Sequence, residues 1–281
     1  MRRRLILKRK HWLNILTYLA LIILIFLVNL PFLSMLGTAL KSRAEALSSV
    51  RLFPREIHFE NFVYVITKTN YSRNLLNSFV AASTATISCV VLASLGGYTI
   101  SRFRSRFFTF YSFFLLVIQM FPLILFLIPL FIIFNTFNLI DTLGSVILSY
   151  TAINLPFSIW MLKGFFDTIP FELEQSAMID GCSQFKCYRL IVLPVAMPGI
   201  TTVAIFTFIN SWNDYLLASI FLRADAAKTL TVGLRTFVQQ FTTDWGYLMA
   251  ASTIASVPTL IFLVVAQKYL IRGLMSGSMK G

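Results

Sequence analysis

The sequence is poor in charged residues for its length. Asp, Glu, Lys and Arg together make up 12% of the 281 residues, whereas a soluble domain carries about twice that share. Hydrophobic residues make up 57% of the chain. The shortage of charge argues against the buried core helices of a soluble protein and favours a chain that lies in lipid.

Histidine and cysteine are also scarce, and their positions fit neither a metal site nor a disulfide framework. Cys89 lies in an apolar run, while Cys182 and Cys187 lie on the side that we predict to be cytoplasmic, where thiols stay reduced. His11 and His58 are far apart in the sequence, and no CxxC pair is present. We therefore expect no metal site.

The motifs of common enzyme classes are missing as well. The sequence has no GxxxxGK[ST] phosphate-binding loop, no HExxH pair and no GxSxG turn. We therefore expect no catalytic residue and no cofactor bound by this chain. If ATP drives this protein, ATP and Mg²⁺ must be bound by a separate partner.

Long stretches with little or no charge are what the sequence has in abundance. A helix needs about 20 apolar residues to cross a bilayer, and each Asp, Lys or Arg at its centre costs about 2.5–3.5 kcal/mol. Six stretches meet these conditions, at residues 13–38, 75–100, 107–140, 142–162, 194–221 and 248–270. The predicted fold class is therefore an all-α integral membrane protein with six transmembrane helices.

Three of these spans carry further signals. The first is longer than the apolar core of a cleaved signal peptide, so we expect it to be retained. The second is rich in small residues such as Ala81 and Ala85, which favour close helix contact. The third is longer than a bilayer is thick, and we expect Pro122 and Pro129 to break it, with its tail lying along the outer surface.

The basic residues predict which side of the membrane each loop faces. With the N-terminus in the cytoplasm, fifteen Lys and Arg residues fall on the cytoplasmic side and nine outside, in agreement with the positive-inside rule. We therefore predict a cytoplasmic basic N-terminus at 1–12, a transmembrane domain at 13–271 and a cytoplasmic tail at 272–281. The net charge of +13 is attributed to contacts with anionic membrane lipid, and no nucleic acid partner is expected.

The cytoplasmic loop at 163–193 begins with the signals of a short helix. Pro170 suits the first turn of a helix, where its missing N–H is no loss. Glu172 and Glu174 follow in that turn, where acidic side chains favour the helix dipole. Gly181 suits the left-handed residue that ends the helix.

A second short helix is predicted to follow in the same loop. Ser183 can cap its start, and we expect Pro194 to end it. The first helix offers Leu173 and Ala177, four residues apart, with acidic residues beside them. From the residues alone, a pair of helices that inserts into a cleft of a cytoplasmic protein and a solvated loop are equally supported.

The loop resembles the EAA motif of ABC importer permeases. That motif reads EAA, three residues, Gly, nine residues and Ile-x-Leu-Pro, and the matching residues here are Gln175, Ser176, Ala177, Gly181, Ile191, Leu193 and Pro194. Segments 154–157, 160–170, 212–215 and 246–251 resemble the carbohydrate branch of this family, in particular the second permease subunit of maltose-type systems. The resemblance covers nearly the whole chain.

The resemblance implies a transmembrane permease subunit that is not itself an enzyme. Such a subunit translocates a mono- or oligosaccharide, delivered by an extracytoplasmic solute-binding protein, across the cell (inner) membrane of a bacterium or archaeon. Its expected partners are a homologous permease subunit, which completes a heterodimer, and two ATPase subunits that bind ATP and Mg²⁺. The tail at 277–281 is expected to approach these ATPases.

The resemblance also assigns ATPase docking to the cytoplasmic loop, which then serves as a coupling loop. The expected docking residues are Glu174, Gln175, Ser176, Ala177, Asp180, Gly181, Leu193 and Pro194. The motif begins with an acid that contacts a basic residue of the ATPase, and this chain has Gln175 there. We expect Gln175 to make a hydrogen bond that is weaker than a charge-assisted one. Glu174 could take its place only after a rotation of about 100° around the helix.

Asp214 is the one carboxylate within a predicted span, which makes it a candidate for a functional role. A polar cavity that binds sugar hydroxyls and stacks on a sugar ring is expected from Asn210, Trp212, Asn213, Asp214 and Tyr215. The alternative is that Asp214 lies near the outer end of its span and caps a helix or forms a pair there. Gln119, near Pro122, is a second candidate for the lining of the cavity.

Three other functions fit less well. An importer for another solute, such as a glycerol phosphate, calls for an extra basic residue in the cavity, and the predicted spans offer none except Lys268 at the cytoplasmic end of the sixth. An ion-coupled secondary carrier needs titratable groups near the middle of the bilayer, where only Asp214 is a candidate. A structural membrane anchor has no translocation path and no ATPase partner.

Overall fold

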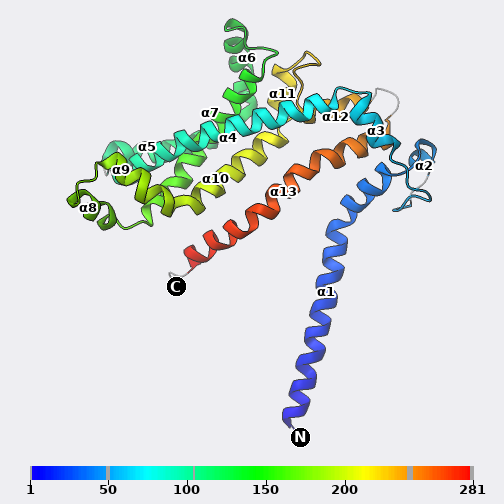
Figure 1. Cartoon of the computed structure of the whole chain (residues 1–281), viewed down its shortest axis with the longest axis horizontal. Helices are drawn as coiled ribbons and strands as arrows, with labels where there is room; N and C mark the ends of the chain where they lie inside the picture. The colour runs from blue at the N-terminus through cyan, green and yellow to red at the C-terminus, as the bar shows by residue number, and fades with distance from the viewer. Residues whose placement is uncertain (1, 49–50, 104, 239–242, 279–281) are drawn as a thin grey trace. The chain divides into compact units, whose positions relative to one another are not determined.

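The computed structural model describes residues 2–48, 51–103, 105–238 and 243–278. Within these residues the regular secondary structure is helical, apart from one isolated antiparallel bridge between Val238 and Thr243. The chain forms two compact units (Figure 1). Unit 1 comprises Met1–Thr69 and Phe237–Ile254, and unit 2 comprises Asn70–Thr236 and Ala255–Gly281.

Unit 1 contains the long first helix and two short helices that follow it. These are α1 (Arg2–Ala39), α2 (Arg43–Ser48) and α3 (Glu60–Thr67), together with the first turns of α13 (Trp245–Ser278). The Asn61 amide closes the end of α1 by donating to Ala39 O and Lys41 O, both at 2.8 Å. Tyr64 stacks on Tyr247 with ring centroids 4.2 Å apart. The segment between the first two predicted spans therefore carries two short helices.

The apolar part of α1, Asn14–Ala39, is long enough to cross a bilayer and buries nothing in the most apolar window of the helix. A helix whose apolar side chains all face outward is stable in lipid, because its backbone groups are satisfied within the helix. This agrees with the prediction of a first span at 13–38.

Unit 2 contains most of the helices and the larger core. They are α4 (Tyr71–Arg102), α5 (Arg106–Gln119), α6 (Leu127–Thr136), α7 (Leu143–Asp167), α8 (Glu172–Ile179), α9 (Gln184–Cys187), α10 (Leu193–Asn213), α11 (Leu216–Phe221), α12 (Leu230–Leu234) and the rest of α13. Three short turns are not α-helical: η1 (Leu123–Phe126), η2 (Tyr188–Val192) and η3 (Arg235–Phe237). The last residue of η3, Phe237, already belongs to the second segment of unit 1.

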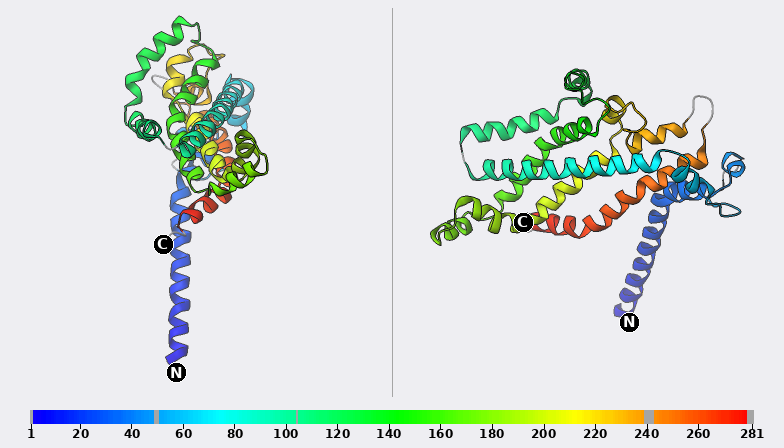
Figure 2. Two further views of the ribbon diagram at one scale, coloured as in Figure 1. Left: turned by 90° about the vertical axis from the view of Figure 1, so that its left-hand side faces the viewer. Right: turned by 45° about the horizontal axis from the view of Figure 1, so that its top comes forward.

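Helices α4, α7 and α10 lie side by side and form the centre of unit 2 (Figures 1 and 2). Their contact depends on small residues of α4, because Ala81, Ala85, Cys89 and Ala93 are completely buried there. Toward the end of α4 the backbones come very close, since a Cβ on Gly97 would lie 3.0 Å from Lys163 N. The prediction that the second span is packed through its small residues is confirmed.

The third span is broken at the first of the two prolines that were expected to break it. Helix α5 and the helical segment 123–136 meet at an angle of 94°, and Pro122 precedes the segment in extended conformation. Pro129 lies in the first turn of α6 and leaves that helix intact, because an N–H in the first turn has no helical partner to lose. The expectation that Pro129 also breaks the span was wrong.

The fifth span differs from its prediction at both ends. It begins at Gln184 and runs as one helical segment to Asn213, through the π-helical turn η2. Pro194 therefore starts α10 rather than ending the helix before it. The Leu193 N–H bonds to Tyr188 O, five residues back, and this wider turn accommodates the proline ring that follows. At the other end the helix stops before Asp214, and α11 is a separate short helix.

Among the residues that the structure describes, five helices are long and apolar enough to cross a membrane, or six if the bent pair α5 and 123–136 counts as one span. This agrees with the six predicted crossings. Helix α7 runs on to Asp167, beyond the predicted end at 162, and α13 continues to Ser278. Residues 272–278 of the predicted tail are therefore helical, and its remaining residues, 279–281, lie outside the described part of the chain.

Candidate functional site

The segment after α7 contains the short helix α8, as predicted, whereas α9 is the first turn of the helical segment that continues through η2 into α10 and is not a separate short helix. Helix α8 ends at Ile179 with Asp180 as its C-cap residue, and Gly181 follows with φ +88° in the left-handed region. Gly181 N donates to Met178 O at 3.1 Å, and Cys182 N donates to Ala177 O at 3.0 Å. These two bonds form a Schellman motif, which reverses the chain between the two helices. The prediction for Gly181 is confirmed.

The starts of both short helices differ in detail from the sequence-based expectation. Pro170 lies outside α8, because Phe171 is the N-cap residue and the helix begins at Glu172. Ser183 occupies the N-cap of α9 as expected, and its carbonyl accepts the first bond, from Cys187 N at 2.9 Å. The Ser183 side chain makes no capping bond. Backbone geometry alone therefore sets the start of α9.

Glu174 is buried, which corrects its assignment to the docking residues. Its carboxylate is 1% exposed and accepts hydrogen bonds from Tyr98 Oη and Arg102 Nε, each at 2.5 Å. Both donors lie near the end of α4. Glu174 therefore cannot replace the missing motif acid at Gln175, since its carboxylate already has partners inside the protein.

The other predicted docking residues lie mainly on the surface. Gln175, Ser176, Asp180, Gly181 and Pro194 are exposed, and Ala177 and Leu193 are half-buried. The structure adds apolar side chains that the sequence reading overlooked: Met178 and Ile179 of α8 are 38% and 85% exposed. Exposed apolar groups beside a polar loop are typical of a surface that binds another protein.

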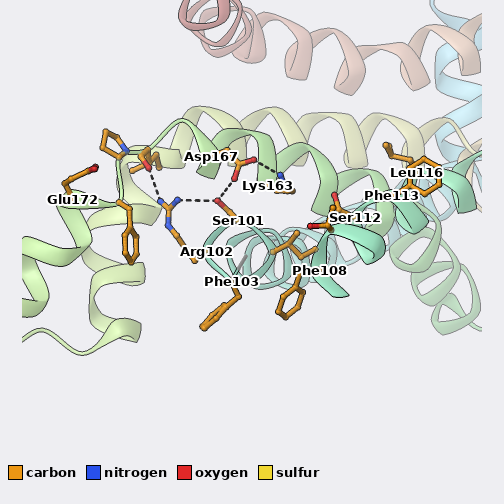
Figure 3. A pocket seen from close by; sticks show the side chains of 15 residues that line it. Ser101, Arg102, Phe103, Phe108, Ser112, Phe113, Leu116, Lys163, Asp167 and Glu172 are labelled. Atoms are coloured by element: carbon orange, nitrogen blue, oxygen red, sulfur yellow. Dashed lines mark hydrogen bonds and ion pairs between the residues drawn. The ribbon is translucent and has the colours of Figure 1, made fainter. Parts of the chain in front are cut away.

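Arg102 lies at the junction of α4, α7 and α8, beside a cavity of about 870 Å³. It donates to the carbonyls of Phe166 and Ile169 at 3.1 and 3.2 Å, in addition to Glu174. Figure 3 shows it in a row of polar groups with Ser101 along the cavity. The walls combine charged, hydroxyl, aliphatic and aromatic side chains, among them Phe103, Phe108, Ser112, Phe113, Lys163, Asp167 and Glu172.

Three of the predicted substrate-path residues, Gln119, Asn210 and Asp214, form hydrogen bonds with α7. Asn210 is exposed, and its amide donates to Asn154 Oδ1 on α7 at 3.2 Å. Asp214 accepts from Tyr150 Oη, also on α7, at 3.1 Å. Gln119 Nε2 reaches the same helix by donating to Ile153 O at 3.1 Å. We call Gln119, Tyr150, Asn154, Asn210 and Asp214 the polar seam.

Asp214 also has a structural role. Its carboxylate accepts from Ala218 N at 3.1 Å and from Leu217 N at 3.5 Å, so it satisfies free N–H groups at the start of α11. The alternative interpretation of Asp214, as a capping residue at the end of its helix, describes these contacts. Tyr215 is exposed beside it and accepts a hydrogen bond from Arg235 Nη1 at 2.6 Å.

Trp212 does not line a cavity, contrary to the prediction. It is 2% exposed, donates from Nε1 to Ala255 O at 3.2 Å and stacks on Phe208, with ring centroids 5.6 Å apart. Trp212 therefore belongs to the core between α10 and α13, and its ring cannot stack on a sugar. Asn213, the next residue, is exposed.

No group of three or more His, Cys, Asp or Glu side chains that could hold a metal ion occurs among the residues described. The chemistry that the site offers is therefore hydrogen bonding by hydroxyl, amide and carboxyl groups at the polar seam, and surface contact at α8.

Comparison with known proteins adds a family to this geometry. Residues 64–276 match the family described as binding-protein-dependent transport system inner membrane component. The chain is 33% identical over 260 residues to the sulfoquinovosyl glycerol transport system permease protein SmoH of Agrobacterium fabrum, which covers 92% of this chain and 91% of SmoH. It is 32% identical over 254 residues to the trehalose transport system permease protein SugB of Mycobacterium tuberculosis, which covers 90% of this chain and 92% of SugB.

A solved structure supports the fold. A chain of a bacterial ABC transporter involved in the import of the acidic polysaccharide alginate matches with a TM-score of 0.79 at 19% identity, over 92% of this chain and 96% of that chain. The family match covers the polar seam and the loop that contains α8 and α9. This chain belongs to the family of inner membrane components of binding-protein-dependent transport systems.

Proposed function

We propose that this chain is the permease subunit of an ATP-binding-cassette importer that translocates a mono- or oligosaccharide. The relative SmoH is named for the transport of sulfoquinovosyl glycerol, and the relative SugB for the transport of trehalose. The observation that carries the proposal is the exposed α8 with its Schellman turn, presented between two long helices and bearing apolar groups at Met178 and Ile179.

The proposed docking partner of α8 is an ATPase subunit, which binds ATP and Mg²⁺. The docking surface consists of the exposed or half-buried residues of the coupling loop, namely Gln175, Ser176, Ala177, Asp180, Gly181, Leu193 and Pro194. Docking to a soluble ATPase places the loop and both termini in the cytoplasm. The complete importer comprises this chain, a homologous permease subunit, two ATPases and an extracytoplasmic solute-binding protein in the cell membrane.

The polar seam is the proposed contact for the sugar. Amide and hydroxyl groups donate and accept hydrogen bonds, which is what sugar hydroxyls require. Asn210 is exposed beside the buried Asn154, so it can exchange its bond to α7 for a bond to substrate. Asn213 and Tyr215 are exposed at the same end of α10 and are proposed to contact the sugar as it enters.

Two rival functions are disfavoured by the seam. A glycerol phosphate needs a cation for its phosphate, and none of the five seam residues is basic. An ion-coupled carrier needs a carboxylate that is free to bind and release the ion, whereas the Asp214 carboxylate is held by Tyr150 and the start of α11. The first rival differs from the proposed importer in its solute, and the second differs in its energy source.

The test is uptake by the complete importer in proteoliposomes. The chain is reconstituted with its partner permease and ATPases, the binding protein is added outside, and a panel of labelled sugars that includes trehalose is supplied. We expect uptake of at least one sugar that requires ATP and the binding protein and that persists when the proton gradient is collapsed. Uptake that needs no ATP and stops with the gradient would contradict the proposal.

A second test addresses docking. A cysteine introduced at Ala177, which is half-buried on α8, is expected to crosslink to an ATPase subunit in native membranes. The matched control is a cysteine at Val238, which is 48% exposed and lies in a segment that we predict to be on the other side of the membrane. Equal crosslinking at both positions, or at neither, would argue against the docking surface.

A further inference from the structure

The end of α4 is joined to α8 by a buried ion pair. Arg102 and Glu174 approach to 2.5 Å, and their side chains are 7% and 1% exposed. Tyr98, one turn earlier on α4, donates to the second carboxylate oxygen at 2.5 Å. Both oxygens of Glu174 are therefore bound by α4. Burial removes water as a competing partner, so the pair is directional and costly to break.

Arg102 also holds the chain segment that enters α8. Its Nη1 donates to Phe166 O near the end of α7, and its Nη2 donates to Ile169 O in the link that follows. The Phe171 ring also lies near Arg102, with its centroid 5.9 Å from the guanidinium carbon. One planar guanidinium thus connects α4, the end of α7, the link and α8. A lysine ammonium lacks the rigid fork that this arrangement uses.

Glu174 is the single buried side chain of α8, a helix that is described in full. Ser176 bonds back to Glu172 O at 2.9 Å within the helix, and the side chains of Gln175 and Ile179 are exposed. The Cys187 thiol approaches Glu174 O at 3.8 Å, which is a weak contact. The ion pair is therefore the main side-chain connection between α8 and the long helices.

We propose that Arg102 and Glu174 are positioning residues, which make α8 move together with the ends of α4 and α7. This inference rests on the proposed function, because movement of α8 matters for transport only if an ATPase docks there. A push on the exposed face of α8 would then reach α4 through the ion pair. Without the pair, α8 could turn on its two flanking loops and the ATPase would lose part of its effect on the permease.

The test compares sugar imported per ATP hydrolysed in the reconstituted importer. Glu174→Gln keeps the shape of the side chain and removes its charge, and Arg102→Lys keeps the charge and removes the fork. For both variants we expect an assembled complex whose ratio of sugar to ATP falls about tenfold or more, which is the lower end of what the loss of a charge-assisted hydrogen bond corresponds to. A wild-type ratio in both assembled variants would overturn the proposal.

The matched control removes an ion pair that lies within one helix. Lys163 bonds to Asp167 at 2.6 Å in an i, i+4 pair on α7, at the rim of the same cavity (Figure 3). Asp167 also accepts a hydrogen bond from Ser101 Oγ on α4 at 2.6 Å. Because Lys163→Gln removes only the bond within α7 and leaves the Ser101 bond in place, it is expected to change the ratio less than about twofold. A loss equal to that of Glu174→Gln would show that the cavity rim matters in general and would also overturn the proposal.

A milder variant decides the matter if the charged variants do not assemble. Tyr98→Phe removes one hydroxyl that binds Glu174 and leaves the ion pair balanced. In the assembled Tyr98→Phe complex we expect faster hydrogen exchange in α8 with unchanged exchange in α4 and α7, and a lower sugar-to-ATP ratio. Unchanged exchange in α8, or a general loss of protection, would overturn the proposal. A wild-type importer that transports no sugar would instead contradict the proposed function, while the exchange result could still be obtained.

Discussion

The side-chain amide of Asn210 on α10 donates to the side-chain carbonyl of Asn154 on α7 at 3.2 Å. One helical turn away, Tyr150 of α7 bonds to Asp214, the residue directly after α10. The two pairs are in register because the residues on each side are four positions apart. Asn154 is buried and Asn210 is exposed, so one member of the first pair is enclosed by the protein and the other is accessible at the surface.

Asn210→Ala should weaken sugar uptake without unfolding the protein. The variant loses one hydrogen bond of about 0.5–1.5 kcal/mol, which corresponds to a rise of about two- to tenfold in the KM for sugar. Uptake at varied sugar concentration measures the KM, and thermal unfolding in detergent measures the stability. A lower Tm with an unchanged KM would show that Asn210 only braces α7.

Asp214 offers a clean separation of capping from substrate binding. Asn caps helix starts about as well as Asp, whereas replacement of a capping residue by Ala costs about 0.5–2 kcal/mol. We therefore expect Asp214→Asn to retain thermal stability and uptake, because an amide oxygen can accept the same N–H groups and can still bond to a sugar hydroxyl. We expect Asp214→Ala to lower both the Tm and the uptake. An Asp214→Asn protein of normal Tm that imports no sugar would assign the carboxylate to the substrate.

Several features of the fold could be predicted from local chemistry. The break at Pro122, the small buried face of α4 and the left-handed Gly181 each depend on one residue type in one conformation. Such features need no knowledge of distant contacts, so a single sequence is sufficient to find them. The long charge-free runs likewise predict spans, because the cost of charge in lipid is local.

The errors involve contacts between residues far apart in the sequence. Glu174 was grouped with the docking residues because its neighbours match a motif, and its buried partners lie about 70 positions earlier on α4. Trp212 was placed in a cavity because it adjoins polar residues, although its ring packs on α13. Pro194 was expected to end a helix, and the π turn before it, which no local rule indicates, lets the helix continue.

The two neighbouring glycines of α4 should tolerate alanine differently. A Cβ on Gly97 would meet backbone atoms of α7 at 3.0 and 3.1 Å, whereas a Cβ on Gly96 would meet only the Ile159 side chain, at 3.3 Å. A side chain can turn away and a helix backbone cannot. We expect Gly97→Ala to lose about 1–3 kcal/mol and Gly96→Ala much less. Thermal unfolding of the two variants, side by side, tests the order, and equal stability would contradict it.

Gly181→Ala should disturb the coupling loop for a conformational reason alone. Nothing lies within 4 Å of a Cβ at this position, so the cost comes from φ +88° and amounts to about 1–2 kcal/mol. Gly164, within α7, also has no atom within 4 Å of its Cβ position, and Gly164→Ala serves as the control. We expect Gly181→Ala to retain less ATPase on purification and Gly164→Ala to retain the wild-type amount. Similar retention by both would contradict a role for the turn in docking.

Gln175→Glu restores the acid that the coupling motif has at this position. The side chain is exposed, so the substitution should leave the fold and the Tm unchanged. If a basic group of the ATPase faces position 175, the neutral bond becomes charge-assisted and about twice as strong. We then expect the ATPase to dissociate more slowly from Gln175→Glu than from wild type, and faster from Gln175→Ala, with the differences shrinking as salt is added. Surface-immobilised permease in nanodiscs gives the dissociation rates.

Equal rates for all three proteins would place Gln175 outside the docking surface, whereas faster dissociation of Gln175→Glu would show that an acidic group of the partner faces it.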